Sequence, residues 1–339
     1  MSDRPESWSR RQFVGGLTLV GTAGLLGMRP EDAAAEPPPE TTRLRLRRGP
    51  VGSVGTAPQF LAEELLRSEG FTDAQYPAMS REERHRALAA GEIDLDVEFV
   101  GSQIAHVDAG HPVVVIGGIH VGCFDLFAHD EIRTVRDLKG KAIGVTELGT
   151  GRHLFFASLM AHIGLDARKD VRFVVRPPAE SVQLFADKKI DAYLAFGEEP
   201  HDLRDRKLGR VVLNSATDRP WSQYFCCTAA ANREFVRKHP IAAKRALRAI
   251  AKATDVCALE PDRAARFLVD KQYAARYDAT RRMLKDIPYQ WRRFDAEDTV
   301  RFYALRLHEA GMIKSTPQKI ITQGTDWRFL RELKKELKG

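Results

Sequence analysis

The sequence is poor in the residues and motifs that most often mark a catalytic or metal centre. It has four cysteines among 339 residues, and none of them has the Cys-x-x-Cys spacing of zinc or thioredoxin-type sites. His-Glu-x-x-His, Gly-x-Ser-x-Gly and P-loop patterns are also absent. So few cysteines in so long a chain exclude a fold held together by disulfides. These absences favour a binding protein over an enzyme, and we expect no cofactor.

The sequence also lacks a concentrated stripe of one charge. Its formal net charge is +7, and residues 1–35 add nothing to this because they hold four arginines and four acidic residues. In the rest of the chain the basic residues are mixed with acids, as in Arg-Glu-Glu-Arg at 81–84. Nucleic-acid-binding proteins more often gather positive charge on one face. We therefore expect a solvated surface and no nucleic-acid partner.

Only one stretch of the chain is apolar enough to interact with a membrane. It covers residues 13–28, contains five glycines and follows the pair Arg10-Arg11. With about 16 residues it is shorter than the roughly 20 needed to span a bilayer. The small residues at 33–35 suit a signal peptidase, and the proline-rich residues 36–42 suit a linker. We expect residues 1–35 to be a cleaved signal and the mature protein to be periplasmic, a retained anchor being the alternative.

The hexamer Ser-Arg-Arg-Gln-Phe-Val at 9–14 resembles the twin-arginine export motif. Val14 and Gly15 stand where that motif usually has leucine and lysine, so the general secretory route stays open.

Beyond the linker, apolar runs typical of strands alternate with amphipathic stretches typical of helices. The expected strands are 44–46, 94–100, 113–116, 142–146, 171–175, 190–196 and 210–213, and the expected helices are 58–69, 80–90, 152–163 and 179–188. From residue 232 onward the pattern is almost entirely helical. This order predicts an α/β fold with parallel sheets covered by helices.

Several segments resemble the nitrate/sulfonate/taurine group of ABC-importer binding proteins. They are Ala57–Glu64, Gly91–Asp94, Asp137–Val145, Lys189–Ala192 and Asn232–Val236 followed by His239-Pro240. The resemblance implies the type II periplasmic binding protein fold, in which two α/β lobes are joined by two crossover strands and ligand binds in the cleft. It implies a first lobe of residues 43–129 plus 222–339 and a second lobe of residues 130–221, with crossovers near 123–129 and 222–230.

The same resemblance implies a function. The chain would be a monomeric solute-binding protein that delivers a small ligand to an ABC permease in the inner membrane. Closure of two lobes about two linking segments is a hinge motion that would shield the ligand from water. A ligand sensor that serves a receptor instead of a permease remains possible.

Ligands of open α/β sheets bind at the carboxyl ends of strands, next to helix N-termini. Applied to the expected strands, this rule selects Ser53, Thr56, Ser102, Gln103 and His120 in the first lobe, Thr146, Gly149, Thr150, Gly151, Arg152 and Glu198 in the second, and Trp221 and Tyr224 at the hinge.

The turn Gly149-Thr150-Gly151 is the sharpest of these signals. Its glycines would expose backbone N–H groups at a helix start, and Arg152 would add a bidentate contact, so the turn favours an anionic ligand such as a sulfonate, carboxylate or nitrate. The alternative is an ordinary turn followed by an exposed arginine.

The other candidates have plainer explanations as well. Ser102 would serve as a helix N-cap, Glu198 as a surface charge, and Trp221 and Tyr224 as packing.

Three cysteines and a histidine come from the two expected crossovers. His120 and Cys123 precede the second lobe, and Cys226 and Cys227 follow it. We consider a soft-metal site, a disulfide between Cys123 and Cys226 or Cys227, and, as the commonest state, buried free thiols.

Residues 224–227, Tyr-Phe-Cys-Cys, are also similar to the cysteine-rich motif of thiamine pyrimidine-precursor synthases. A synthase-like enzyme or a binding protein for such a precursor is therefore the alternative function. The expected export signal argues against the enzyme, since that chemistry is intracellular.

Overall fold

The computed structural model describes residues 36–48, 54–77, 79 and 81–337, so the expected signal at 1–35 and the candidate Ser53 lie outside it. Residues 38–339 form one compact unit, which is the subject of everything below. Among the described helices, none combines the length and the apolar character that a membrane crossing requires.

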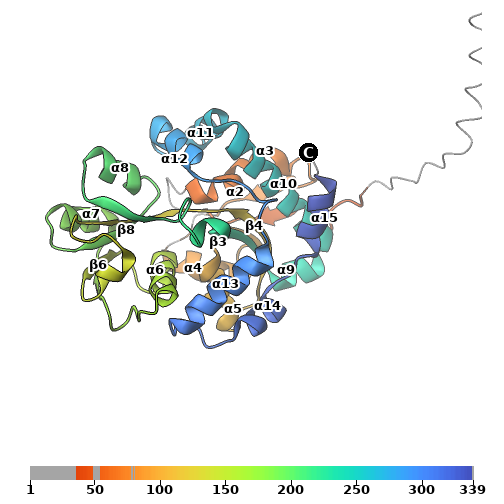
Figure 1. The fold of residues 1–339 in the computed structure, drawn as a ribbon. Coiled ribbons are helices and arrows are strands. Elements are labelled where there is room, and N and C mark those ends of the chain that lie inside the picture. The colour runs from red at the N-terminus through yellow and green to blue at the C-terminus, as the bar shows by residue number, and fades with distance from the viewer. Residues whose placement is uncertain (1–35, 49–53, 78, 80, 338–339) are drawn as a thin grey trace, which may run out of the picture. The chain divides into compact units, whose positions relative to one another are not determined.

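Two five-stranded arrays form the framework of this unit (Figure 1). The first contains, in spatial order, β2 (Asp73–Gln75), β1 (Arg43–Arg45), β3 (Leu95–Phe99), β10 (Cys227–Asn232) and β4 (Val113–His120). A single parallel bridge, Leu46 to Leu95, joins the β1–β2 pair to the other three strands. The second sheet contains β7 (Arg172–Val175), β6 (Ala142–Val145), β8 (Ala192–Phe196), β5 (Phe124–Ala128) and β9 (Arg210–Asn214). We call the first array with its helices the first lobe, and the second sheet with its helices the second lobe.

Both sheets are mixed, which corrects the expectation of parallel sheets. β5 runs antiparallel to β8 and β9, and β10 runs antiparallel to β3 and β4. Each of these strands enters its sheet directly from the other lobe. A chain that arrives at the carboxyl ends of the existing strands must run back along them, so the inserted strand is antiparallel. The chain therefore passes between the lobes twice, from β4 to β5 and from β9 to β10.

The helices occur in the expected order. The first lobe carries α2 (Ala57–Leu61), α3 (Glu63–Leu66), α4 (Arg81–Ala90), α5 (Val100–Asp108), α9 (Arg233–Lys238), α10 (Pro240–Leu259), α11 (Pro261–Asp270), α12 (Tyr277–Asp286), α13 (Ala296–Glu309), α14 (Pro317–Gly324) and α15 (Arg328–Glu336). The second carries α6 (Gly151–His162), α7 (Pro178–Ala186) and α8 (Glu199–Asp205). The single helix expected at 58–69 is instead two short helices, because Ala62 adopts a tighter, 3₁₀-like geometry (φ −57°, ψ −21°).

α10 explains how the helical C-terminal part is attached to the first sheet. Pro240 opens the helix at a position where its missing N–H costs nothing. Its buried face is rich in alanine, as at Ala242, Ala246 and Ala249, which lets the helix approach the sheet closely. Gly117 of β4 accepts this approach, since a Cβ there would lie 2.9 Å from Leu247 Cδ1.

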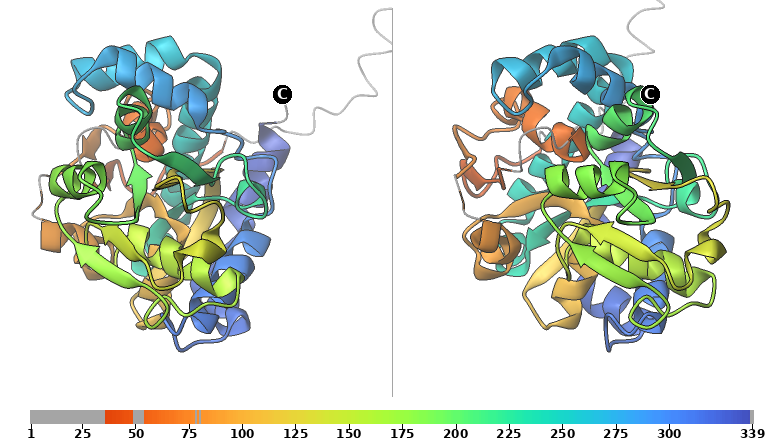
Figure 2. Two further views of the ribbon diagram at one scale, coloured as in Figure 1. Left: turned by 60° about the vertical axis from the view of Figure 1, so that its left-hand side comes forward. Right: turned by 90° about the vertical axis from the view of Figure 1, so that its left-hand side faces the viewer.

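One apolar core runs through both lobes. α6 of the second lobe packs on α13 of the first. Between the lobes, Phe99 of β3 meets Phe124 of β5 and Phe155 of α6 edge-on, with ring centroids 5.5 and 6.0 Å apart. Figure 2 shows the yellow-to-green second lobe from two further sides, with the blue C-terminal helices behind it in the right-hand view. The space between the lobes is thus filled by aromatic side chains on the α6–α13 side.

Candidate functional site

A cavity of about 300 Å³ opens where the two lobes meet the two crossings. The first lobe contributes the short 3₁₀ turn η1 (Val54–Thr56) and the end of α12, and the second contributes the end of β8 and α8. The lining residues are Val54, Gly55, Gly122, Cys123, Asp125, Phe196, Gly197, Pro200, His201, Arg204, Asn214, Ala216, Thr217, Met283, Asp286 and Ile287. This is the cleft in which the type II fold predicts a ligand.

The two crossings are bonded to each other beside the cavity. Ser215 Oγ accepts hydrogen bonds from the backbone N–H groups of Cys123 (3.1 Å) and Phe124 (2.9 Å). The Ser215 N–H donates in return to the Phe124 carbonyl at 2.9 Å. Asn214 Oδ1 accepts from the Ala216 N–H at 2.8 Å and closes the turn that follows β9. These hydrogen bonds join the two crossings into one hinge at this end of the cavity. Closure of the lobes would rotate about that hinge.

The cavity wall carries charges of both signs. Arg204 of α8 is paired with Asp125 of β5, and its guanidinium lies 5.5 Å from the Phe127 ring centroid. Burial raises the pKa of Asp125, and Arg204 opposes that rise. His201 Nε2 lies 3.3 Å from Asp286 Oδ2 of the first lobe. Burial lowers the pKa of His201, so its imidazole is mainly neutral at pH 7.

Further ion pairs join α8 and the loop before it to the first lobe outside the cavity. Glu198 Oε2 is 2.8 Å from Arg276, and Asp205 Oδ2 is 3.4 Å from Arg282. These side chains are largely exposed apart from Glu198, and exposed pairs contribute only about 0–1 kcal/mol each. Pairs that weak hold the lobes together without locking them.

A cluster of sulfur and nitrogen donors lies at the inner wall of the cavity. His120 Nε2 and Cys227 Sγ are each near Cys123 Sγ, at 3.9 Å in both cases. His120 and Cys227 are buried, whereas Cys123 is partly exposed and lines the cavity. All four cysteines are free thiols, so the disulfide considered for Cys123 is not formed.

The environment of the cluster shifts its acid–base properties. Burial raises the pKa of the Cys123 thiol, but hydrogen bonds from Cys226 and Cys227 outweigh burial and lower it to about 6. The hydrogen bond to Cys123 raises the pKa of Cys227 to about 11. Cys123 is therefore the most readily ionised thiol of the three.

Arg152, the predicted anion contact, is already held by protein groups. Its two terminal nitrogens form a bidentate pair with Glu199 at 2.6 and 2.7 Å. It also donates to Tyr193 Oη at 2.9 Å and to the Leu194 carbonyl at 3.1 Å. In this conformation its guanidinium is not available to a ligand, because Glu199, 47 residues further along the chain, occupies both terminal nitrogens.

The glycine turn before Arg152 is formed as expected, with Gly149 exposed and Gly151 lying against the first lobe. Gly149 has φ +78°, and its N–H donates to His153 Nδ1 at 3.0 Å. Thr150 Oγ1 donates to the Glu147 carbonyl at 2.9 Å. Thr146 precedes the turn and is half-buried. A Cβ on Gly151 would lie 3.5 Å from Ser102 Oγ, so the start of α6 touches α5 of the first lobe.

The remaining candidates divide between the interior and the hinge. Ser102 and Gln103 are buried in α5, where the Gln103 amide donates to the Thr228 carbonyl at 2.8 Å. Ser102 makes no N-cap bond, because α5 begins two residues earlier. Trp221 is 1% exposed and belongs to the aromatic core, and Tyr224 stacks on Phe302 at 4.1 Å. The packing explanation of these two aromatic residues is the one the structure supports.

The cavity is lined by neighbours of the predicted residues. Thr56 and His120 adjoin the lining residues of η1 and the first crossing, and Glu198 follows the lining residue Gly197. The titratable residues of the wall that sequence reasoning missed include Asp125, His201, Arg204 and Asp286. Extending the strand-end rule to the helix after β8 would have found His201 and Arg204. No local signal marks Asp286, which reaches the cavity through the packing of α12.

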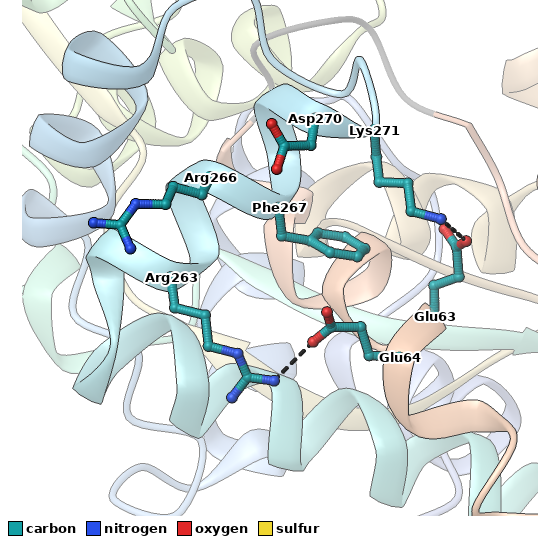
Figure 3. A pocket seen from close by; sticks show the side chains of 7 residues that line it. All are labelled: Glu63, Glu64, Arg263, Arg266, Phe267, Asp270 and Lys271. Atoms are coloured by element: carbon teal, nitrogen blue, oxygen red, sulfur yellow. Dashed lines mark hydrogen bonds and ion pairs between the residues drawn. The ribbon is translucent and has the colours of Figure 1, made fainter.

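A second depression, of about 530 Å³, lies on the helices of the first lobe (Figure 3). It is lined by Glu63, Glu64, Arg263, Arg266, Phe267, Asp270 and Lys271. Lys271 pairs with Glu63, and Arg263 pairs with Glu64, both at 2.8 Å. It is larger than the interlobe cavity, but four of its charged side chains form these two pairs and no strand end lines it. We therefore treat it as a surface groove.

The sequence of this chain is similar to those of known proteins. The profile of a family described as NMT1/THI5 like matches residues 73–264, which is more than half of the chain. A protein of Brucella abortus (strain 2308) named "Putative binding protein" is 29% identical over 192 residues, covering 55% of this chain. The chain spans 59% of the length of that relative.

Solved structures match over more of the chain. The periplasmic nitrate-binding protein NrtA from Synechocystis PCC 6803 aligns with a TM-score of 0.70 and 15% identity, covering 89% of this chain and 90% of that one. The periplasmic aliphatic sulphonate-binding protein SsuA from Escherichia coli aligns with a TM-score of 0.65 and 17% identity, covering 83% and 92%. At these identities the likeness establishes the shared periplasmic binding protein fold.

Proposed function

The chain belongs to the NMT1/THI5-like family, and from that premise we propose that it is an exported solute-binding protein. It captures a small molecule between its lobes in the periplasm and presents it to an ABC permease. The named ligands of its structural neighbours are nitrate and sulphonates, which supports a small, polar solute.

The observation that carries the proposal is the position of the interlobe cavity. Its wall combines both lobes and both crossings, so hinge closure would change its volume and its access to water. A volume of about 300 Å³ is at the small end of the range for ligand sites. The cavity therefore suits a compact solute.

The charges of the wall favour a solute with both an anionic and a cationic group. Arg204 lines the cavity, and its side chain is 39% exposed compared with 14% for Arg152, so Arg204 is the more accessible of the two arginines. Asp286 supplies a carboxylate from the opposite lobe. An aminosulfonate such as taurine has this pair of groups, with the sulfonate directed to Arg204 and the amine to Asp286.

Binding fits the cavity better than catalysis does. Among the described residues that line it there is no lysine that could form an aldimine with pyridoxal phosphate. We expect no aldimine absorbance when the purified protein is incubated with pyridoxal phosphate. That outcome would separate a binding protein from a synthase-like enzyme.

A thermal-shift screen tests the proposal. Taurine carries both charged groups, ethanesulfonate carries only the anion, and ethylamine carries only the amine. A solute at 100 times its dissociation constant stabilises the folded state by about 2.7 kcal/mol, and we expect taurine or a close analogue to give the largest shift. An equal response to ethanesulfonate would contradict the need for both charges.

Two arginines of the same region provide a matched pair of variants. Arg204→Gln removes the cationic group from the cavity and should abolish most of the thermal shift. Arg206→Gln removes an exposed arginine that pairs with Asp202 at 3.1 Å and should leave the shift unchanged. If both variants respond like the parent protein, the ligand does not bind in this cavity.

A further inference from the structure

His120, Cys123 and Cys227 come from distant parts of the sequence and converge beside the cavity. One ligand atom from each, His120 Nε2 and the two Sγ atoms, lies within 4.8 Å of the others. His120 ends β4, Cys123 lies in the first crossing, and Cys227 begins β10, which returns from the second crossing. The fold therefore holds the three donors in place from both passages between the lobes.

The spacing of the donors matches the coordination of a thiophilic metal ion. With Zn–S bonds of about 2.3 Å and tetrahedral angles, two sulfur ligands are about 3.8 Å apart, and a sulfur and an imidazole nitrogen about 3.6 Å apart. The corresponding distances here are both 3.9 Å. Cys123 Sγ is thus within a few tenths of an ångström of zinc-binding spacing from both other donors, and all three donors lie within 4.8 Å of one another. A disulfide, in contrast, needs about 2.05 Å.

The surroundings orient His120 toward the cluster. Its Nδ1 lies 3.1 Å from the Val121 carbonyl, and a backbone carbonyl on the far ring nitrogen is the usual arrangement of a metal-binding imidazole. The ring is packed edge-on against Tyr289 at 5.4 Å. Nε2 lies 2.9 Å from the Gly55 carbonyl, to which it donates a hydrogen bond when it carries the ring proton. A metal ion bound by Nε2 would take the place of that proton.

Gly55 keeps one face of the donor triangle open. A Cβ built on this residue would lie 3.1 Å from Cys123 Sγ, 3.4 Å from His120 Nε2 and 3.6 Å from Cys227 Sγ. It would therefore cover the donors almost evenly. Since Gly55 and Cys123 both line the cavity, the fourth coordination position can be reached from it.

We propose that His120, Cys123 and Cys227 bind one thiophilic metal ion, with Zn²⁺ as the first ion to test. Two thiolates and a neutral imidazole balance the charge of Zn²⁺, which a buried site requires. Three protein ligands with one open position are typical of zinc that exchanges its fourth ligand. The site goes beyond solute capture, and its metal binding does not depend on whether the cavity binds an aminosulfonate.

The test uses the purified full chain with its thiols kept reduced by a phosphine. Competition with a chromophoric chelator should give one Zn²⁺ per chain. Co²⁺ in its place should give the near-ultraviolet absorption of thiolate-to-cobalt charge transfer. Cys123→Ser and Cys227→Ser should each weaken Zn²⁺ binding more than about tenfold, since even loss of an outer-shell partner costs 10–100-fold.

Two further variants keep the test decisive if a buried substitution unfolds the protein. Gly55→Ala retains every donor but covers the open face, so it should weaken Zn²⁺ binding while thermal unfolding shows an intact fold. Cys257→Ser removes a buried cysteine of α10 that is outside the cluster and should bind like the parent. Absence of Zn²⁺ binding to the reduced parent, or equal binding by folded Cys123→Ser, would overturn the proposal.

Discussion

The two lobes repeat one strand order but differ in how they are covered. We leave the inserted strands β5 and β10 out of the count and number the other four strands of each lobe in chain order. Each sheet then has the spatial order second, first, third, inserted strand, fourth. In the first lobe β4 is buried along its whole length beneath α10, α14 and α15. In the second lobe the edge strand β7 is half-exposed, and α6, α7 and α8 are its only described α-helices.

A second parallel between the lobes concerns buried arginines. In each lobe an arginine that follows the first strand pairs with a carboxylate on or just after the third strand. Arg47 Nε lies 2.8 Å from Asp96 in the first lobe, and Arg152 pairs with Glu199 in the second. In both lobes the ion pair thus joins the segment after the first strand to a carboxylate on or after the neighbouring third strand. The helices that cover the lobe decide how deeply the pair is buried. From the difference in cover we expect the first lobe to be the more rigid partner and the second to be the one that moves on closure.

The largest effects should come from the two buried ion pairs. Asp96→Ala removes the nearer of the two carboxylates beside the buried Arg47, and Glu199→Ala removes the carboxylate paired with Arg152. Breaking a buried pair in this way should lower the free energy of unfolding by about 3–5 kcal/mol. Glu199→Ala should cost more, because Arg47 keeps Glu98 Oε2 at 3.9 Å after Asp96→Ala. Urea unfolding followed by tryptophan fluorescence measures both. Asp73→Ala, at an exposed pair with Arg43, is the control and should change stability by less than about 1 kcal/mol.

The N-caps of α13 and α6 also differ between the lobes, and the expected effect on stability is smaller. Asp295 caps α13 of the first lobe by accepting from the N–H groups of Glu297 (2.7 Å) and Asp298 (3.0 Å). Thr150 stands at the same position of α6 but makes no cap bond. Asp295→Ala should therefore cost about 1 kcal/mol, and Thr150→Ala less, in thermal unfolding. Equal losses would contradict the difference between the two helix starts.

The mobility of the second lobe is tested by the ion pair between Arg276 and Glu198. Arg276→Ala should change the free energy of unfolding by no more than about 1 kcal/mol. It should nevertheless increase the radius of gyration in small-angle X-ray scattering without solute, because one contact that favours closure is gone. Arg301→Ala, which removes a pair within α13, should leave the radius unchanged.

The smallest effect is a pH dependence confined to the first lobe. Asp108 accepts hydrogen bonds from the N–H groups of Ser315 (2.7 Å) and Lys314 (3.1 Å). Burial opposes these bonds, but together they lower the pKa of Asp108. A depressed carboxyl pKa stabilises the fold above the ordinary value near 3.8 and loses that contribution as pH falls through the folded-state pKa. Asp108→Asn should be less stable than the parent at pH 7, and the difference should shrink toward pH 2–3.

The fold could be predicted far better from the sequence than the site could. Apolar runs such as 113–116 and 142–146 predict β4 and β6 because a strand buried on both faces has no alternative composition. The break of the first helix at Ala62 and the antiparallel insertion of β5 and β10 have no local signature. They follow from where the chain must go when it changes lobe.

For the site, the strand-end rule indicates the right loops but not the right side chains. Arg152 has the sequence context of an anion ligand, yet Glu199 occupies it. Asp286 has no such context, yet it lines the cavity. Whether a polar side chain remains available depends on partners that are distant in the sequence.

The sequence by itself determines the alternation of strands and helices, because hydrophobic periodicity is a local property of the chain. The tertiary structure alone decides which charges face the cavity and which sulfur atoms meet. Cys123 and Cys227 are separated by 104 residues and come within 3.9 Å because the chain crosses between the lobes twice at one place. The two crossings, which no local pattern encodes, set the geometry of both the cavity and the donor cluster.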